Sequence, residues 1–156
     1  AQADLTRQRH GLSSTAPGLT SAGGCGLHGA LSFGPSLLYV MLGGAVGSGL
    51  RFALVSGAAR CLGTGWPYGT FAVNVLGSFV MGLCAVWLLQ RGGAASLLLM
   101  TGVLGGFTTF SAYSLDAVRL VEADRVGAAI GYAGGSVVAS ILALVLGMAA
   151  ARGLGA

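Results

Sequence analysis

The sequence predicts an all-α integral membrane protein with four transmembrane helices. Of its 156 residues 54% are apolar and only 8% are charged, which is too few charges to cover the surface of a soluble domain. A membrane span needs about 20 mostly apolar residues, so residues 36–151 have room for four spans and short loops. We therefore expect one four-helix domain over residues 36–156. Residues 1–35 are rich in Gly, Ser, Thr and Ala, and we expect a flexible N-terminal extension there.

The first predicted span covers residues 36–58, and the second covers residues 69–90. The first is apolar except for Arg51, and its Gly43 and Gly47 lie one turn apart, which lets another helix approach closely. Aromatic residues near both ends of the second span suit the headgroup region, where amphipathic rings are enriched. They are Trp66, Tyr68 and Trp87.

The third predicted span, residues 96–120, contains two glycines and two threonines near its middle. Gly105-Gly106 and Thr108-Thr109 weaken a helix, so we expect a break near the bilayer centre. Such a break is tolerated only where protein or a water-filled cavity satisfies the freed backbone groups. The fourth span, residues 126–151, carries glycines at four-residue spacing, which imply close helix packing. This glycine ridge consists of Gly127, Gly131 and Gly135.

The basic residues are distributed along the whole chain. All eight are arginines, whereas a polynucleotide site needs basic and aromatic residues clustered on one face. We expect no nucleic-acid partner. Four spans place nearly equal numbers of arginines on the two sides of the membrane, so the positive-inside rule gives almost no preferred orientation. An antiparallel dimer of identical subunits is therefore allowed.

Residues suited to metal binding or to catalysis are few. The three cysteines show no C-x-x-C spacing, and both histidines, His10 and His28, lie within residues 1–35. No Ser/His/Asp or Cys/His set can be assembled from the four spans. We expect no enzyme, and no metal site built from side chains.

Asn74 is the only asparagine in the chain, and it lies in an apolar span, where an unpaired amide is costly. It therefore needs a partner. Hydroxyls lie one turn before and one turn after it, and the fourth span repeats this spacing. Such hydroxyls also bond to their own backbone or hold helices together, but two matched stripes favour a polar pathway. The stripes consist of Thr70, Asn74 and Ser78, and of Tyr132, Ser136 and Ser140.

The stripes offer amide and hydroxyl donors without a charged group at their centre, which suits a small anion. A proton-coupled carrier would need a titratable group near the midplane, and Asp116 lies toward the end of the third span. Phe110 and Tyr113 follow the expected break, three residues apart. They can turn their electropositive ring edges toward an anion; packing in an aromatic core is the alternative.

Three sequence blocks resemble, in order and spacing, the signature blocks of the fluoride channels of the CrcB, or Fluc, family. The resemblance covers about residues 37–151, and its third block is highly specific. The blocks are Gly43-Gly44-x-x-Gly47-x-x-x-Arg51-Phe52, then Gly69-Thr70-Phe71-Ala72-Val73-Asn74-x-x-Gly77-x-Phe79-x-x-Gly82, and then Gly102-x-x-Gly105-Gly106-Phe107-Thr108-Thr109-Phe110-Ser111.

The resemblance implies a fluoride-selective channel that exports toxic fluoride passively across the plasma membrane, the cell inner membrane in a Gram-negative source. It implies a dual-topology antiparallel homodimer with two pores, and a structural sodium ion held by the backbone carbonyls of Gly105 and Thr108. Arg51 would lie in the vestibule. The residues implied along the fluoride pathway are Thr70, Asn74, Phe110, Tyr113, Tyr132, Ser136 and Ser140, to which the polar stripe adds Ser78.

One residue departs from the family pattern, and two other readings compete. The second ring position is usually Phe in the family and is Tyr113 here, which keeps the aromatic edge and adds a hydroxyl. A small four-helix multidrug exporter has a similar length, but it would use an acid in its first span, and residues 36–58 contain none. A non-transporting assembly subunit would explain the glycine ridge but neither Asn74 nor the expected break.

Overall fold

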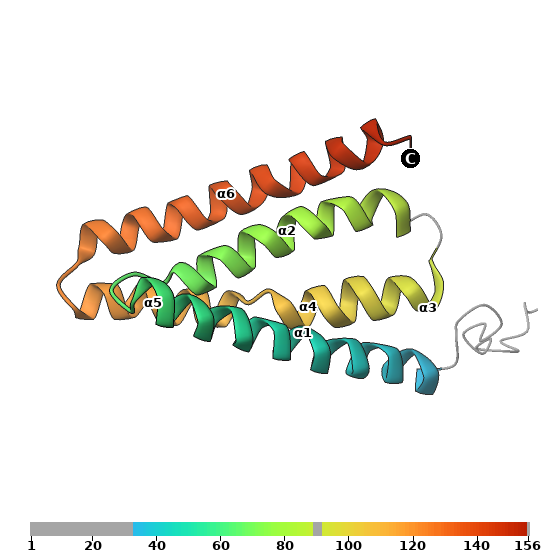
Figure 1. The fold of residues 1–156 in the computed structure, drawn as a ribbon, viewed down its shortest axis with the longest axis horizontal. Coiled ribbons are helices and arrows are strands. Elements are labelled where there is room, and N and C mark those ends of the chain that lie inside the picture. Colours follow the sequence, from blue (N-terminus) through green and yellow to red (C-terminus); the bar gives the residue numbers. More distant parts are fainter. Residues whose placement is uncertain (1–32, 89–91, 156) are drawn as a thin grey trace, which may run out of the picture. The chain divides into compact units, whose positions relative to one another are not determined.

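The computed structural model describes residues 33–88 and 92–155, and every regular element in this part of the chain is a helix (Figure 1). Most of the predicted N-terminal extension, and the predicted end of the second span at residue 90, lie outside the described residues. The elements are α1 (Phe33–Leu62), α2 (Tyr68–Leu88), α3 (Gly93–Ser96), the π-helix η1 (Leu97–Leu104), α4 (Gly105–Phe107), α5 (Phe110–Glu122) and α6 (Val126–Gly153).

Four helical stretches are long and apolar enough to cross a membrane, as predicted from the sequence. They are Phe33–Leu62, Tyr68–Leu88, Gly93–Glu122 and Val126–Gly153. The first begins three residues earlier than expected and places Pro35 in its first turn, where a missing amide donor costs least. Together, α3, η1, α4 and α5 form the third span.

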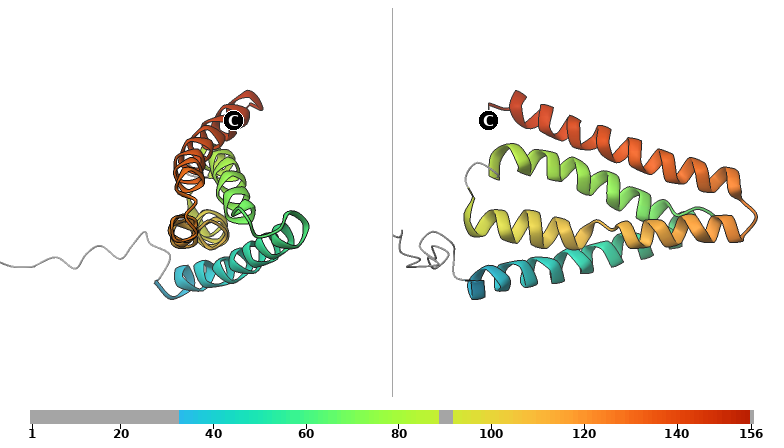
Figure 2. Two further views of the ribbon diagram at one scale, coloured as in Figure 1. Left: turned by 90° about the vertical axis from the view of Figure 1, so that its left-hand side faces the viewer. Right: turned by 180° about the vertical axis from the view of Figure 1, so that it is seen from behind.

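The third span lies between α1 on one side and α6 on the other, and it also contacts α2 (Figures 1 and 2). The packing partners of α1 are η1, α4 and α2, while α6 packs along α2 and against α5. The first half of the third span therefore packs against α1, and its second half packs against α6.

The predicted break in the third span is present, and the threonines form it. Thr108 (φ −77°, ψ 157°) and Thr109 (φ −155°, ψ 125°) are extended, and α5 starts at the next residue. Gly105 and Gly106 remain helical in α4. At Gly106 a side chain would meet the backbone of Gly44 in α1, so this glycine allows close packing and does not itself interrupt the helix.

The expected close approach at the glycines of the first span is confirmed. A Cβ atom at Gly43 would overlap the carbonyl oxygen of Leu98, and one at Gly47 would overlap that of Val103. The partner helix is therefore η1. The glycine ridge of α6 differs, because a Cβ added at Gly127, Gly131 or Gly135 would meet nothing within 4 Å. That ridge packs against none of the described helices of this chain.

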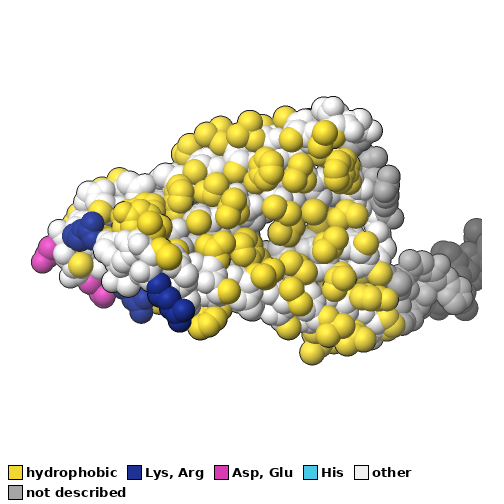
Figure 3. Space-filling view, viewed as in Figure 1, with side chains coloured by type: hydrophobic (Ala, Val, Ile, Leu, Met, Phe, Trp, Pro, Cys, Tyr) yellow, Lys and Arg dark blue, Asp and Glu magenta, His cyan; other side chains and the backbone are white. Residues whose placement is uncertain are grey.

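Large apolar side chains point outward from the subunit. On the visible face charged side chains gather toward the end where α5 turns into α6, and apolar side chains are spread over much of the remaining face (Figure 3). Examples are Leu146 in α6, which is 62% exposed, and Phe52 in α1, which is 75% exposed. A surface of this kind fits lipid or a second membrane protein and does not fit water.

Candidate functional site

A cavity of about 360 Å³ lies beside the break in the third span, and we call it the break cavity. Its lining comes from α2, the break, α5 and α6, and among the described lining residues none is charged. Apart from the two threonines, its polar and aromatic lining belongs to the predicted pathway. That lining consists of Asn74, Ser78, Thr108, Thr109, Phe110, Tyr113, Ser136 and Ser140.

The partner that Asn74 requires is the backbone of the break. Its Nδ2 donates to the carbonyl oxygen of Thr109 at 3.1 Å, and its Oδ1 accepts from the Thr109 amide at 2.9 Å. The side-chain amide thus pairs with an extended residue as a neighbouring strand would. One Nδ2 hydrogen is left for another acceptor, because an amide nitrogen carries two.

Side chains also hold the two ends of the broken helix. The Oγ1 of Thr109 accepts from the amide of Ala112 at 3.2 Å and so caps the start of α5. The Oγ1 of Thr108 donates to the carbonyl of Leu104 at 3.0 Å. The break is therefore a defined local structure with its own hydrogen bonds.

The same bonds leave two carbonyls without their helical donors. In a continuous helix the amide of Thr109 would donate to Gly105, and that of Ala112 would donate to Thr108. Those amides donate to Asn74 and to the Thr109 side chain instead. Two hard oxygen acceptors, on Gly105 and Thr108, are free to bind a cation or water. They fit the predicted sodium ligands, although an ion needs further oxygens than these two.

Two buried hydroxyls have no hydrogen-bond partner among the described residues. Tyr132 is fully buried and Ser136 is 3% exposed, yet neither the Tyr132 hydroxyl nor the Ser136 Oγ is paired. An unsatisfied buried hydroxyl costs about 1–3 kcal/mol. Ser136 lines the break cavity, so a polar species there would relieve part of that cost.

Three aromatic rings form a row from the break toward α6. The ring centroids of Phe110 and Tyr113 lie 5.3 Å apart, and those of Tyr113 and Tyr132 lie 5.4 Å apart. Tyr113 packs against the buried cluster around Tyr132, whereas Phe110 is 77% exposed. Core packing therefore explains the position of Tyr113 but not that of Phe110.

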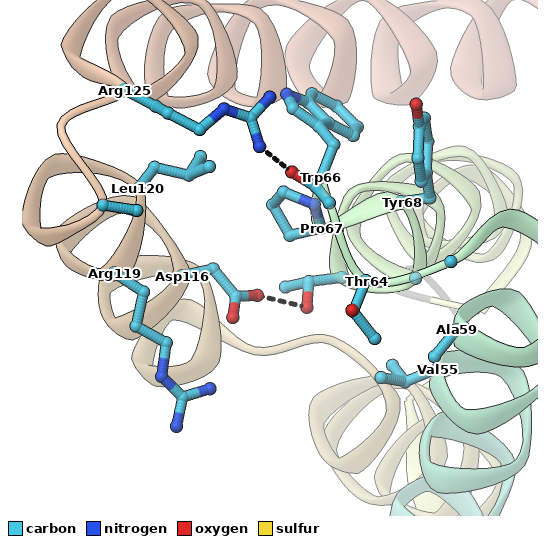
Figure 4. A pocket seen from close by; sticks show the side chains of 15 residues that line it. Val55, Ala59, Thr64, Trp66, Pro67, Tyr68, Asp116, Arg119, Leu120 and Arg125 are labelled. Atoms are coloured by element: carbon cyan, nitrogen blue, oxygen red, sulfur yellow. Dashed lines mark hydrogen bonds between the residues drawn. The ribbon is translucent and has the colours of Figure 1, made fainter.

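A second cavity, of about 340 Å³, lies toward the charged end, and we call it the end cavity (Figure 4). Thr70 opens onto this cavity and not onto the break cavity, and its Oγ1 donates to Oδ2 of Asp116 at 2.6 Å. Arg125 donates to the carbonyl oxygen of Gly65, whereas Arg119 is directed away from Asp116. Three of its polar side chains, Thr70, Asp116 and Arg125, therefore have partners within the chain.

Sequence reasoning gave Asp116 no role in the site. Its spacing could have identified it, because Asp116 follows Phe110 and Tyr113 at three-residue intervals and so lies near the same face of α5.

Arg51, in contrast, was predicted as a site residue, and the structure brings it to neither cavity. It is half-buried in α1, and its place in a vestibule stays a prediction. Among the described residues, no three His, Cys, Asp or Glu side chains gather as metal ligands.

Four helices are long and apolar enough to cross a membrane, and three of the four spans line a cavity without charged side chains. These features define a small multi-pass membrane protein. A family model described as "CrcB-like protein, Camphor Resistance (CrcB)" matches residues 38–148. The chain belongs to this family.

Curated relatives are similar over nearly their whole length. A protein of Cereibacter sphaeroides named "Fluoride-specific ion channel FluC" is 52% identical over 118 residues, which are 76% of this chain and 95% of that protein. A protein of the same name from Phenylobacterium zucineum is 51% identical, over 75% of this chain and 95% of its own length. A third, from Caulobacter vibrioides, is 48% identical, over 74% and 94%.

Proposed function

We propose that this protein is a fluoride-selective ion channel of the plasma membrane, the inner membrane in a Gram-negative cell, and that it exports fluoride passively to relieve fluoride toxicity. The observation that carries the proposal is the break cavity, with donors, aromatic rings and no charged side chain among its described lining residues. The names of the relatives support fluoride as the ion.

Fluoride is small and holds water tightly, so a selective pore must replace its hydration with several donors at close range. The donors available in the break cavity are the free Nδ2 hydrogen of Asn74 and the unpaired hydroxyl of Ser136. The Tyr132 hydroxyl is also unpaired, but Tyr132 lies outside the lining of both cavities. Ser78 and Ser140 extend the series along the cavity. A cationic side chain in direct contact with the anion would hold it too strongly for rapid exit, and the uncharged lining avoids this.

The aromatic residues and the helix end add weaker positive fields. The exposed ring of Phe110 can turn its positive edge toward the anion, and Tyr113 continues the row. The break also places the N-terminus of α5, the positive end of its helix dipole, beside the cavity. These contributions favour an anion without binding it permanently.

We propose that the end cavity, which Thr70 and Asp116 line, lies on the route of the ion between the break cavity and the aqueous phase. The Asp116 carboxylate would repel an anion, but Arg119 and Arg125 line the same cavity and reduce that repulsion. Arg51 would act similarly at the vestibule. We assign this end the entry or exit of the ion.

The carbonyls of Gly105 and Thr108 would hold a structural sodium ion, which when bound would supply fixed positive charge beside the break. Two carbonyls are too few for a sodium site. Gly105 is exposed on the outside of the subunit, so a second copy can bring the same two oxygens to the ion.

The partner we propose is a second copy in antiparallel orientation, giving a dual-topology homodimer with two pores. Three features support it, because each is uncovered within the subunit and could be covered by a second copy. They are Phe110, Gly105 and the glycine ridge of α6. A two-fold interface uses the same surface on both subunits. The even arginine distribution permits the two orientations.

Fluoride efflux from liposomes that contain the purified protein tests the proposal, with chloride as the comparison ion. We expect fluoride release while chloride is retained. Equal release of both ions, or release of neither, would contradict a fluoride-selective channel. A multidrug exporter would instead couple cation transport to protons, for which the first span lacks an acid.

A further inference from the structure

The hydroxyl of Tyr113 connects two helices that are far apart in the sequence. It donates to the backbone carbonyl of Ala133 in α6 at 3.0 Å, across 20 residues of sequence. Ala133 lies inside a regular helix, so its carbonyl already accepts the helical bond from residue 137. A carbonyl oxygen has two lone pairs and can accept the second donor. The bond therefore joins α5 to α6 without breaking either helix.

This bond lies at the centre of the aromatic row. The ring of Tyr113 contacts Phe110 on one side, at an interplanar angle of 35°, and Tyr132 on the other, at 37°. Phe110 is largely exposed, so Tyr113 is the aromatic neighbour within the subunit that can orient it. The tilt of Tyr113 thus influences how Phe110 faces the break cavity.

The hydrogen bond of the hydroxyl restricts the tilt of the Tyr113 ring, whereas a phenylalanine ring at this position would have no such restraint. Rotation about the ring axis leaves the hydroxyl in place, but a change of tilt moves it away from Ala133 and breaks the bond. Because the hydroxyl donates its hydrogen to Ala133, that hydrogen is not available to an anion in the cavity. What Tyr113 can then offer an anion is the positive edge of its ring.

We propose that Tyr113 is a positioning residue: its hydroxyl holds α5 against α6 at Ala133 and so fixes the ring pair of Phe110 and Tyr113 at the break cavity. The proposal rests on the proposed function, because the ring pair matters only if an anion passes it. In this proposal the Tyr113 hydroxyl, which the usual Phe lacks, positions the rings and does not bind the anion.

The bond can be observed without any flux measurement. The dipeptide Ala-Gly occurs in this sequence only at Ala22-Gly23 and Ala133-Gly134. A full-length sample with carbonyl-labelled alanine and nitrogen-labelled glycine therefore gives a carbonyl–amide correlation spectrum with one signal from Ala133 and one reference signal. We expect Tyr113→Phe to shift the Ala133 carbonyl upfield and to leave the reference signal in place.

The functional readout is fluoride efflux from liposomes by the same variant. We expect Tyr113→Phe to slow fluoride release about fivefold, the order of one neutral hydrogen bond, with fluoride still preferred over chloride. Tyr39→Phe removes a hydroxyl from α1, outside the lining of both cavities, and should change neither readout. Replacing Tyr113 by 4-aminophenylalanine, whose amine can donate again, should restore both.

Several results would overturn the proposal. An unmoved Ala133 signal in Tyr113→Phe means that the bond is not formed in the bilayer. A shifted signal with wild-type efflux means that the bond exists but positions nothing of consequence, while the channel function stands. A loss of fluoride selectivity in Tyr113→Phe means that the hydroxyl contacts the anion itself. A wild-type protein that releases no fluoride ends the proposed function, and this inference falls with it.

Discussion

The two cavities of this subunit differ in how their polar groups are satisfied. In the end cavity Thr70 is bonded to Asp116, and Arg125 is bonded to the carbonyl of Gly65. In the break cavity no described lining side chain is charged, and the Ser136 hydroxyl lacks a partner. Charge alone would have pointed to the end cavity. Unsatisfied donors point to the break cavity, and an anion that must shed water needs those donors.

The largest effect is expected from Phe110→Ile. Isoleucine is similar in hydrophobicity but has no positive ring edge, so we expect fluoride efflux to fall about 100-fold, a barrier increase of about 2.7 kcal/mol. Because Phe110 is 77% exposed, the subunit itself should lose little stability. Phe52→Ile changes an equally exposed ring in α1, outside both cavities. Equal loss of efflux in the two variants would contradict a specific role for Phe110.

Asn74→Ala should have the next largest effect, because it removes two hydrogen bonds to Thr109. At about 1 kcal/mol per bond, we expect a loss of about 2 kcal/mol in stability, together with about 30-fold slower fluoride efflux. Thermal unfolding in detergent and liposome efflux measure the two effects. Ser78→Ala, one turn along the same face, should retain the stability. Unchanged unfolding of Asn74→Ala would show that the amide does not hold the break.

Ser136→Ala separates function from stability. Removing an unpaired buried hydroxyl is close to neutral for stability or stabilising, yet it takes a donor from the break cavity. We expect about tenfold slower fluoride efflux, about 1.4 kcal/mol in barrier, with an unchanged or higher melting temperature. Ser114 bonds to the carbonyl of Phe110 in its own helix, and Ser114→Ala should leave efflux unaltered. Faster or equal efflux in Ser136→Ala would remove this serine from the pathway.

The smallest effect is expected in the end cavity. Thr70→Val keeps the side-chain shape and removes the hydroxyl that donates to Asp116. We expect this loss to slow fluoride efflux by less than about threefold, because the Thr70 hydroxyl is already bonded to Asp116 and is not free to bind the ion. The ratio of fluoride to chloride release should not change. Thr101→Val, at an exposed position of η1, is the matched control. A loss of selectivity in Thr70→Val would move the selective step to the end cavity.

Much of the architecture could be predicted, because it follows from the apolar composition and from the helical spacing of polar and small residues. Apolar length predicted the four spans. The glycine and threonine pairs predicted the break, which the threonines form while the glycines stay helical. A hydrogen-bond partner for Asn74 could also be predicted, because leaving its amide unpaired in an apolar helix is costly. Helical spacing placed Ser136 and Ser140 on one face of α6, and the structure brings both to the same cavity as Asn74.

What could not be predicted depends on how helices rotate against one another. The period assigns a residue to a face of its own helix but not to the neighbour that this face meets. Thr70 and Asn74 share a stripe on α2, yet Thr70 bonds to Asp116 in α5 and Asn74 bonds to Thr109 at the break. Nothing in the apolar run of residues 97–104 predicts the π-helical turns of η1. The glycine spacing of α6 is the same as that of a ridge packed against another helix, so the sequence cannot show that this ridge is unpacked.

The most direct test of an uncharged, fluoride-selective break cavity is the reversal potential of the purified protein in a planar bilayer, with fluoride on one side and chloride on the other. We predict current that reverses far from zero, in the direction set by the fluoride gradient, because chloride does not pass. A reversal potential at zero would mean that both ions pass equally and would contradict the account.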